Sequence, residues 1–140
     1  MVTETWLKEG AELEGLREGL EEEAGLGMVC RNRIPGERGV SHGGVAILWQ
    51  TSKMTVKVLD IKNSEDYEVL ATAATVPGQR RKLVILACYI PPNYVKKRGE
   101  GALDYITDRI VELKRRFHDP QLLIAGDFNQ WDIALSLIHI

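Results

Sequence analysis

Cysteine is scarce in this chain, and neither cysteine nor histidine shows a metal-binding spacing. Cys30 and Cys88 do not form a Cys-x-x-Cys pair, and the three histidines are scattered. This excludes a disulfide-rich scaffold and a zinc domain built on such a spacing. Because Cys88 lies in an apolar run, we expect it to be a buried thiol in an intracellular, reducing environment.

Long apolar runs and an excess of positive charge are also missing. The longest apolar run, Leu83–Ile90, is far shorter than the roughly 20 residues of a membrane span, and the N-terminus shows no charged-then-apolar leader. We therefore expect no membrane partner and no secretory signal. The net charge of −2, from 18 basic and 20 acidic side chains, excludes a histone-like binder of polyanions. The net charge does not exclude an enzyme that acts on nucleic acid, because local basic patches can bind its substrate.

Two common phosphate-binding loops are absent as well. The chain contains no GxxxxGK[ST] sequence, and no GxGxxG sequence follows a predicted strand. Nucleotide binding through either of these loops is therefore not expected.

Hydrophobic periodicity predicts two helices and a series of strands. Apolar residues at three- and four-residue steps indicate helices over Lys8–Ala24 and Ala102–Phe117, the second with a stripe that includes Leu103. Strand patterns cover residues 28–33, 45–50, 54–59, 67–76, 83–90 and 121–125, the last as a buried strand. This order predicts an α/β or α+β sandwich with mixed sheets and no regular βαβ repeat.

Polar side chains stand at the ends of two predicted strands. Asp127 and Asn129 follow the last strand, where they could hold a hydrated Mg²⁺ or orient a water beside a phosphate. Taken alone, this pair is more simply an Asx turn. Tyr89 ends another strand, where its hydroxyl could donate to a phosphate oxygen or lie half-buried. Glu4 precedes the first helix and by itself indicates only a helix-start charge.

Basic residues after residue 79 are grouped in triplets. Each triplet alone is typical of a solvated surface, but together they are compatible with a rim that faces phosphates. One triplet, Lys114–Arg116, lies near the end of the second predicted helix. The candidate nucleic-acid contacts are Arg80, Arg81, Lys82, Lys96, Lys97 and Arg98.

Four short blocks follow one another along the chain: TETWL, GGVAIL, ACYIPPN and LLIAGDFN. In this order they resemble the endonuclease/exonuclease/phosphatase family, and most closely the endonuclease domain of non-LTR (LINE-type) retrotransposon polyproteins. The resemblance spans residues 3–132. It implies a truncated DNase I-like fold, a four-layer sandwich of two mixed β-sheets flanked by helices. The pair Gly43-Gly44 would let a strand begin close to its neighbours.

The resemblance also implies roles for the candidate residues. Glu4 would be the ligand of Mg²⁺, or of Mn²⁺ in its place, and Tyr89 would contact the scissile phosphate. Asp127 would position or activate the attacking water. Asn129 would hydrogen-bond the phosphate and orient Asp127.

The implied activity is Mg²⁺-dependent phosphodiester hydrolysis that nicks target DNA for retrotransposition. The implied partners are DNA and a downstream reverse transcriptase domain of the same polyprotein, and the implied place of action is the nucleus. Two alternatives stay open. One is an inositol-phosphate or lipid phosphodiesterase of the same superfamily, and the other is a non-catalytic remnant that only binds nucleic acid.

The chain departs from the family pattern towards both ends. The family's first strand and its late serine-aspartate-histidine block have no counterpart here, so we expect residues 1–134 to be a partial domain. The segment LSLIHI, residues 135–140, looks like translated adapter sequence from DNA library preparation. We expect it to be a non-native tail, with a genuine apolar strand as the alternative.

We expect the purified chain to nick DNA weakly or not at all and to aggregate. No residue takes the role of the family's late histidine, and unpaired apolar sheet edges favour association. Nicking of supercoiled plasmid in Mg²⁺ and size-exclusion chromatography measure the two properties. Efficient nicking that Asp127→Ala abolishes would contradict this expectation.

Overall fold

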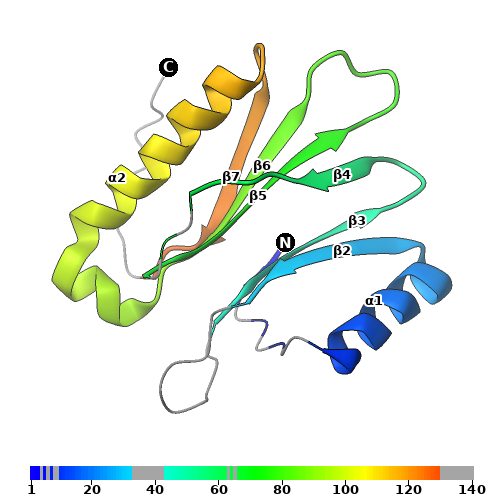
Figure 1. The fold of residues 1–140 in the computed structure, drawn as a ribbon, viewed down its shortest axis with the longest axis horizontal. Helices are drawn as coiled ribbons and strands as arrows, with labels where there is room; N and C mark the ends of the chain where they lie inside the picture. The colour runs from blue at the N-terminus through cyan, green and yellow to red at the C-terminus, as the bar shows by residue number, and fades with distance from the viewer. Residues whose placement is uncertain are drawn as a thin grey trace.

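The computed structural model describes residues 1–3, 5, 7, 10–32, 43–62, 64 and 66–129, without the side chains of residues 93–100. Seven strands and two helices lie in this part of the chain (Figure 1). In chain order they are β1 (Val2–Thr3), α1 (Ala11–Ala24), β2 (Leu26–Arg31), β3 (Val45–Gln50), β4 (Thr55–Val58), β5 (Glu68–Thr75), β6 (Leu83–Tyr89), α2 (Pro92–Arg116) and β7 (Gln121–Asp127).

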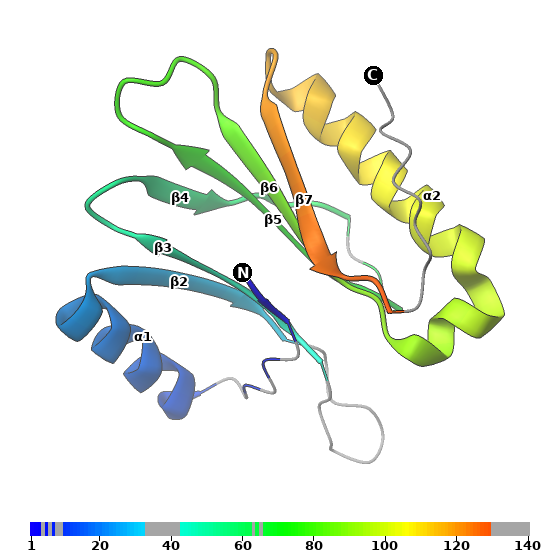
Figure 2. The same cartoon turned by 180° about the vertical axis from the view of Figure 1, so that it is seen from behind.

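The strands form two sheets that face each other, and one helix covers the outer side of each sheet (Figures 1 and 2). The three-stranded sheet has the order β1-β3-β2 and is antiparallel. The four-stranded sheet has the order β4-β5-β6-β7 and is mixed, because β6 and β7 are parallel. The expected α/β sandwich of four layers is confirmed. Mixed pairing is expected in both sheets but occurs only in the four-stranded sheet, because all described pairs of the three-stranded sheet are antiparallel.

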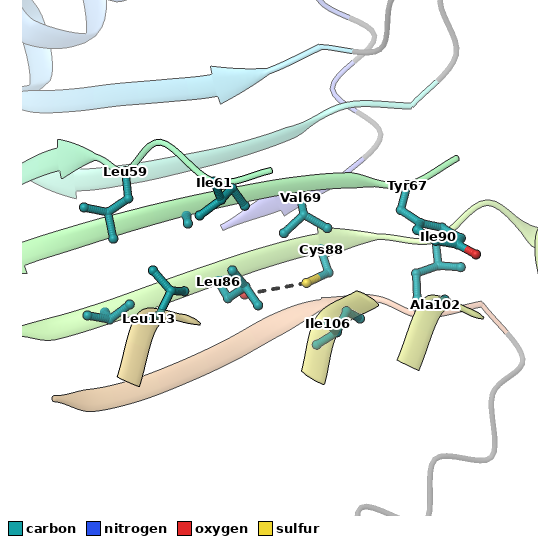
Figure 3. Packing of buried hydrophobic residues seen from close by; sticks show 12 residues of the cluster. Leu59, Ile61, Tyr67, Val69, Leu86, Cys88, Ile90, Ala102, Ile106 and Leu113 are labelled. Carbon is teal, nitrogen blue, oxygen red and sulfur yellow. Dashed lines mark hydrogen bonds between the residues drawn. The ribbon is translucent and has the colours of Figure 1, made fainter. Parts of the chain in front are cut away.

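The larger core lies between the four-stranded sheet and α2 (Figure 3). Alternate residues of β6 point towards the helix, so Leu86 and Cys88 pack against Ile106 and Leu113. Leu86 and Cys88 are completely buried, which confirms the predicted buried thiol. Burial raises the pKa of the Cys88 thiol to about 12, so it is protonated at neutral pH.

The last strand is an edge strand, and the prediction of a buried strand over residues 121–125 is wrong. In the described part of the chain β7 pairs with β6 alone. Leu123 and Ile124 are 47% and 38% exposed. An apolar run cannot distinguish a central strand from an edge strand, because long-range pairing decides which neighbours a strand has.

Helix α2 is longer than predicted and presents a slightly different stripe. It begins at Pro92 rather than Ala102, with proline in the first turn, where its missing N–H is harmless. The buried stripe includes Ala102 and Ile106, whereas Leu103 is 44% exposed and lies off it. Among the described residues, neither helix has a stretch long and apolar enough to cross a membrane.

Leu86→Ala is expected to lower the free energy of unfolding by about 2–5 kcal/mol, because it opens a cavity in the core under α2. Leu123→Ala removes the same atoms from the exposed edge strand and is expected to change it by at most about 0.5 kcal/mol. Urea unfolding of both variants checks the assignment. Equal losses would contradict the burial of Leu86.

Candidate functional site

Three polar residues form a row across one edge of the four-stranded sheet. Glu68 is the first residue of β5, and Tyr89 and Asp127 are the last residues of β6 and β7. Tyr89 is the register partner of Glu68 on one side and of Asp127 on the other, at strand spacings of about 5 Å. Register partners share a face of the sheet, so all three belong to the face towards the other sheet. We call this arrangement the Glu68–Tyr89–Asp127 row.

Tyr89 is buried between the two sheets rather than half-buried. Its side chain is 5% exposed and belongs to the inter-sheet core, with Val45 and Ile47 of β3 and Leu70 of β5. The phenol is therefore held in place by packing on both sides. This packing fixes the position of the ring between the two sheets.

Asp127 and Asn129 form the Asx turn that the spacing favours. The backbone N–H of Asn129 donates to Oδ1 of Asp127 at 2.9 Å, and Nδ2 of Asn129 donates to the carbonyl of Ile90 at 2.8 Å. The backbone N–H of Ile90 donates to the carbonyl of Asp127 at 3.0 Å. Asn129 has a φ of 41°, a conformation that asparagine tolerates. The loop after β7 is thus tied to the end of β6, and the turn fixes the orientation of the Asp127 carboxylate.

The glycine pair before β3 permits this close packing. Gly43 and Gly44 have φ values of 105° and 98°, which side chains rarely adopt. A Cβ at Gly43 would lie 2.9 Å from Cε1 of Tyr89 and 3.4 Å from Oε1 of Glu68, and a Cβ at Gly44 would lie 2.5 Å from Oγ1 of Thr5. The expectation that these glycines let the strand begin close to its neighbours is confirmed.

Glu68 is a member of the row that the sequence reasoning missed. Its side chain is 4% exposed, and a buried carboxylate is rare because desolvation is costly. One signal was available in the sequence. Glu68 is the one charged residue in the predicted strand over residues 67–76, which otherwise contains apolar residues and threonines.

Glu4 lies outside the described residues. Two described neighbours lie at the edge with the row, since Thr3 of β1 pairs with Val45 and Thr5 lies beside Gly44. Strand β1 also contacts β7. Within the described ranges, no group of three or more histidine, cysteine, aspartate or glutamate side chains could hold a metal ion.

The candidate nucleic-acid contacts do not come together on one surface. Residues 80–82 lie in the turn between β5 and β6, six residue steps and about 20 Å along β6 from Tyr89. Residues 96–98 lie in the first half of α2, which begins just after Tyr89, so their backbone is at the same end as the row. Their side chains are outside the described part.

Gly43→Ala is expected to destabilise the protein more than Gly78→Ala. Both glycines have a positive φ, so both variants lose about 1–2 kcal/mol to backbone strain. Only the Cβ at Gly43 meets another group, the Tyr89 ring, which adds about 1 kcal/mol or more, whereas nothing lies within 4 Å at Gly78. Urea midpoints of the two variants compare them. Equal destabilisation would argue against contact between Gly43 and Tyr89.

Comparison with known proteins agrees with the described geometry. The family model of the endonuclease/exonuclease/phosphatase family matches residues 1–139. No curated protein matches the chain. Members of the family are hydrolytic nucleases and phosphatases that commonly use divalent metal ions. With nearly its whole length matched and with the layered α/β sandwich in place, this chain belongs to the endonuclease/exonuclease/phosphatase family.

Proposed function

We propose that this chain is a divalent-metal-dependent DNA endonuclease whose site is the edge that carries the Glu68–Tyr89–Asp127 row. The observation that carries the proposal is the parallel register of β6 and β7, which sets Asp127 beside Tyr89 at the carboxyl ends of both strands. Catalytic and binding groups favour this edge of α/β sheets. Family membership supports phosphodiester hydrolysis in general.

The donor groups at this edge fit Mg²⁺, with Mn²⁺ as the substitute. Magnesium prefers oxygen ligands and usually takes only one or two carboxylates, with water and substrate phosphate completing its shell. Asp127 uses Oδ1 for the Asx turn, and its other oxygen accepts no hydrogen bond from the described residues. Nearby, Thr5 Oγ1 and Asn32 Oδ1 are buried without a hydrogen-bond partner in the described structure. The family resemblance would add the carboxylate of Glu4.

Three residues of the site have a physical role in the proposed hydrolysis. Asp127, held by its turn, would accept a hydrogen bond from the attacking water and align it with the phosphorus. The hydroxyl of Tyr89 would donate to a phosphoryl oxygen as negative charge develops there. Asn129 would keep Asp127 in place through its backbone N–H and its bond to Ile90. A bound divalent ion would supply neutralisation of phosphoryl charge.

DNA is the proposed substrate, and nicking for retrotransposition the proposed purpose. The TETWL block supports this choice, as does the position of Lys96–Arg98 at the same end of the sandwich as the row. The proposed partner is a downstream reverse transcriptase domain, and the proposed place of action is chromosomal DNA in the nucleus.

Asp127→Asn is expected to abolish both Mg²⁺-dependent nicking and stabilisation by Mg²⁺. The reason is that it removes the negative charge proposed to face the ion and the attacking water. The wild-type chain, at high protein-to-plasmid ratio, is expected to nick supercoiled plasmid slowly in Mg²⁺ and not in EDTA. Mg²⁺ is also expected to raise its unfolding temperature by binding the native state. Asp127→Asn should lower nicking about 100-fold or more and lose the thermal shift.

Asp108→Asn is the matched control, since Asp108 is an exposed carboxylate on α2 that forms no ion pair among the described residues. It should keep both properties. Nicking that persists in EDTA or in Asp127→Asn would refute the proposal. Hydrolysis of inositol phosphates or phospholipids without plasmid nicking would refute DNA as substrate. Metal-independent DNA binding without any hydrolysis would instead support a non-catalytic remnant.

A further inference from the structure

Two basic segments, far apart in the sequence, meet at the end of the sandwich opposite to Tyr89. One is the turn between β5 and β6, and the other is the last turn of α2. An ion pair between Arg81 and Asp119 joins them, and the backbone N–H of Gln121 donates to the carbonyl of Lys82 at 2.9 Å. The junction of α2, β7 and the hairpin is visible in Figure 1. We call their basic residues the distal basic surface: Arg80, Arg81, Lys82, Lys114, Arg115 and Arg116.

Much of this positive charge is uncompensated. All six side chains are exposed. Arg81 is paired with Asp119, and Arg116 lies 3.5 Å from Glu112. Within the described part of the chain, the other four form no ion pair.

The helix terminus explains only half of the surface. Bases in the last turn of a helix interact favourably with the partial negative charge of its C-terminus, and this accounts for residues 114–116. Residues 80–82 lie in a turn and not in a helix. Of these three, Arg81 pairs with Asp119 and Lys82 donates to Oγ1 of Thr75, whereas Arg80 has neither kind of contact among the described residues.

We propose that the distal basic surface binds the phosphate backbone of nucleic acid, separately from the site of hydrolysis. The turn residues before Arg80 are Pro77, Gly78 and Gln79. Protein interfaces and membrane-binding faces rely on apolar or aromatic contacts, and none of the large apolar side chains that the described structure leaves exposed lies within residues 77–82 or 114–119. Long, flexible lysine and arginine side chains on two segments suit the repeating phosphates of a nucleic-acid backbone. Contacts to phosphate give binding without sequence preference.

The distance between the two regions makes this a second contact. About 20 Å of strand β6 separates the surface from Tyr89, so a phosphate held at the row does not occupy it. Only the choice of nucleic acid as the polyanion rests on the proposed function. Binding at this surface requires neither metal nor hydrolysis, so the two proposals can fail independently.

The test compares two variants that each lose three positive charges. Arg80→Gln/Lys114→Gln/Arg115→Gln removes surface side chains that form no hydrogen bond or ion pair among the described residues. Lys53→Gln/Lys57→Gln/Lys62→Gln removes three exposed lysines that are not members of the surface, from β4 and the segments on either side of it, and is the control for net charge. Fluorescence polarisation with a labelled 20-base-pair DNA in EDTA, over a series of salt concentrations, measures binding by the full chain. Circular dichroism checks that both variants are folded.

The surface variant is expected to bind about tenfold more weakly at low salt, with a shallower salt dependence by about 2–3 in the log–log slope. The control should keep most of the affinity, and Asp127→Asn should bind like wild type. Equal losses in both triple variants would overturn the proposal, because net charge alone would then explain binding. Stronger binding to phosphatidylserine vesicles than to DNA would overturn it as well. If the surface variant loses binding but wild type never nicks plasmid, only the proposed function fails.

Discussion

Strands β6 and β7 run parallel, so the chain must cross from one end of the sheet to the other between them, and α2 makes this crossing. The crossing has consequences at both ends of the molecule. At one end it brings Asp127 into register with Tyr89. At the other end it brings the basic last turn of α2 beside the hairpin that joins β5 and β6. The same helix supplies the apolar face that buries Leu86 and Cys88.

The edge with the row is built from groups that are unfavourable on their own. Gly43 and Gly44 adopt positive φ values, Asn129 has a left-handed backbone, and Glu68 buries a carboxylate. Strain and buried charge of this kind persist only where the surrounding structure holds them, and they cluster at functional sites. Here the inter-sheet core around Tyr89 and the hydrogen bonds that Ile90 forms with Asp127 and Asn129 hold them. The strained backbone and the buried carboxylate therefore indicate the same edge of the sandwich as a candidate site as the strand register does.

The Asx turn is compatible with both a structural role and the proposed catalytic role of Asp127 and Asn129. A turn of this kind needs no function to explain it, because the backbone N–H of Asn129 satisfies one carboxylate oxygen. The same bond restricts the rotation of Asp127, and a positioned carboxylate aligns a water better than a mobile one. The row and the distal basic surface lie at opposite ends of strand β6.

The sequence by itself determined the local structure of this protein and the identity of most residues at its edge. Apolar periodicity predicts α1, the second half of α2 and the strands β2 to β7, and the four blocks identify Tyr89, Asp127 and Asn129 as candidates. Only the tertiary structure decided that β7 is an edge strand, that Glu68 joins the row, and that residues 80–82 lie far from Tyr89. Periodicity reports which face of an element is apolar, but strand order and register depend on contacts between segments distant in the chain.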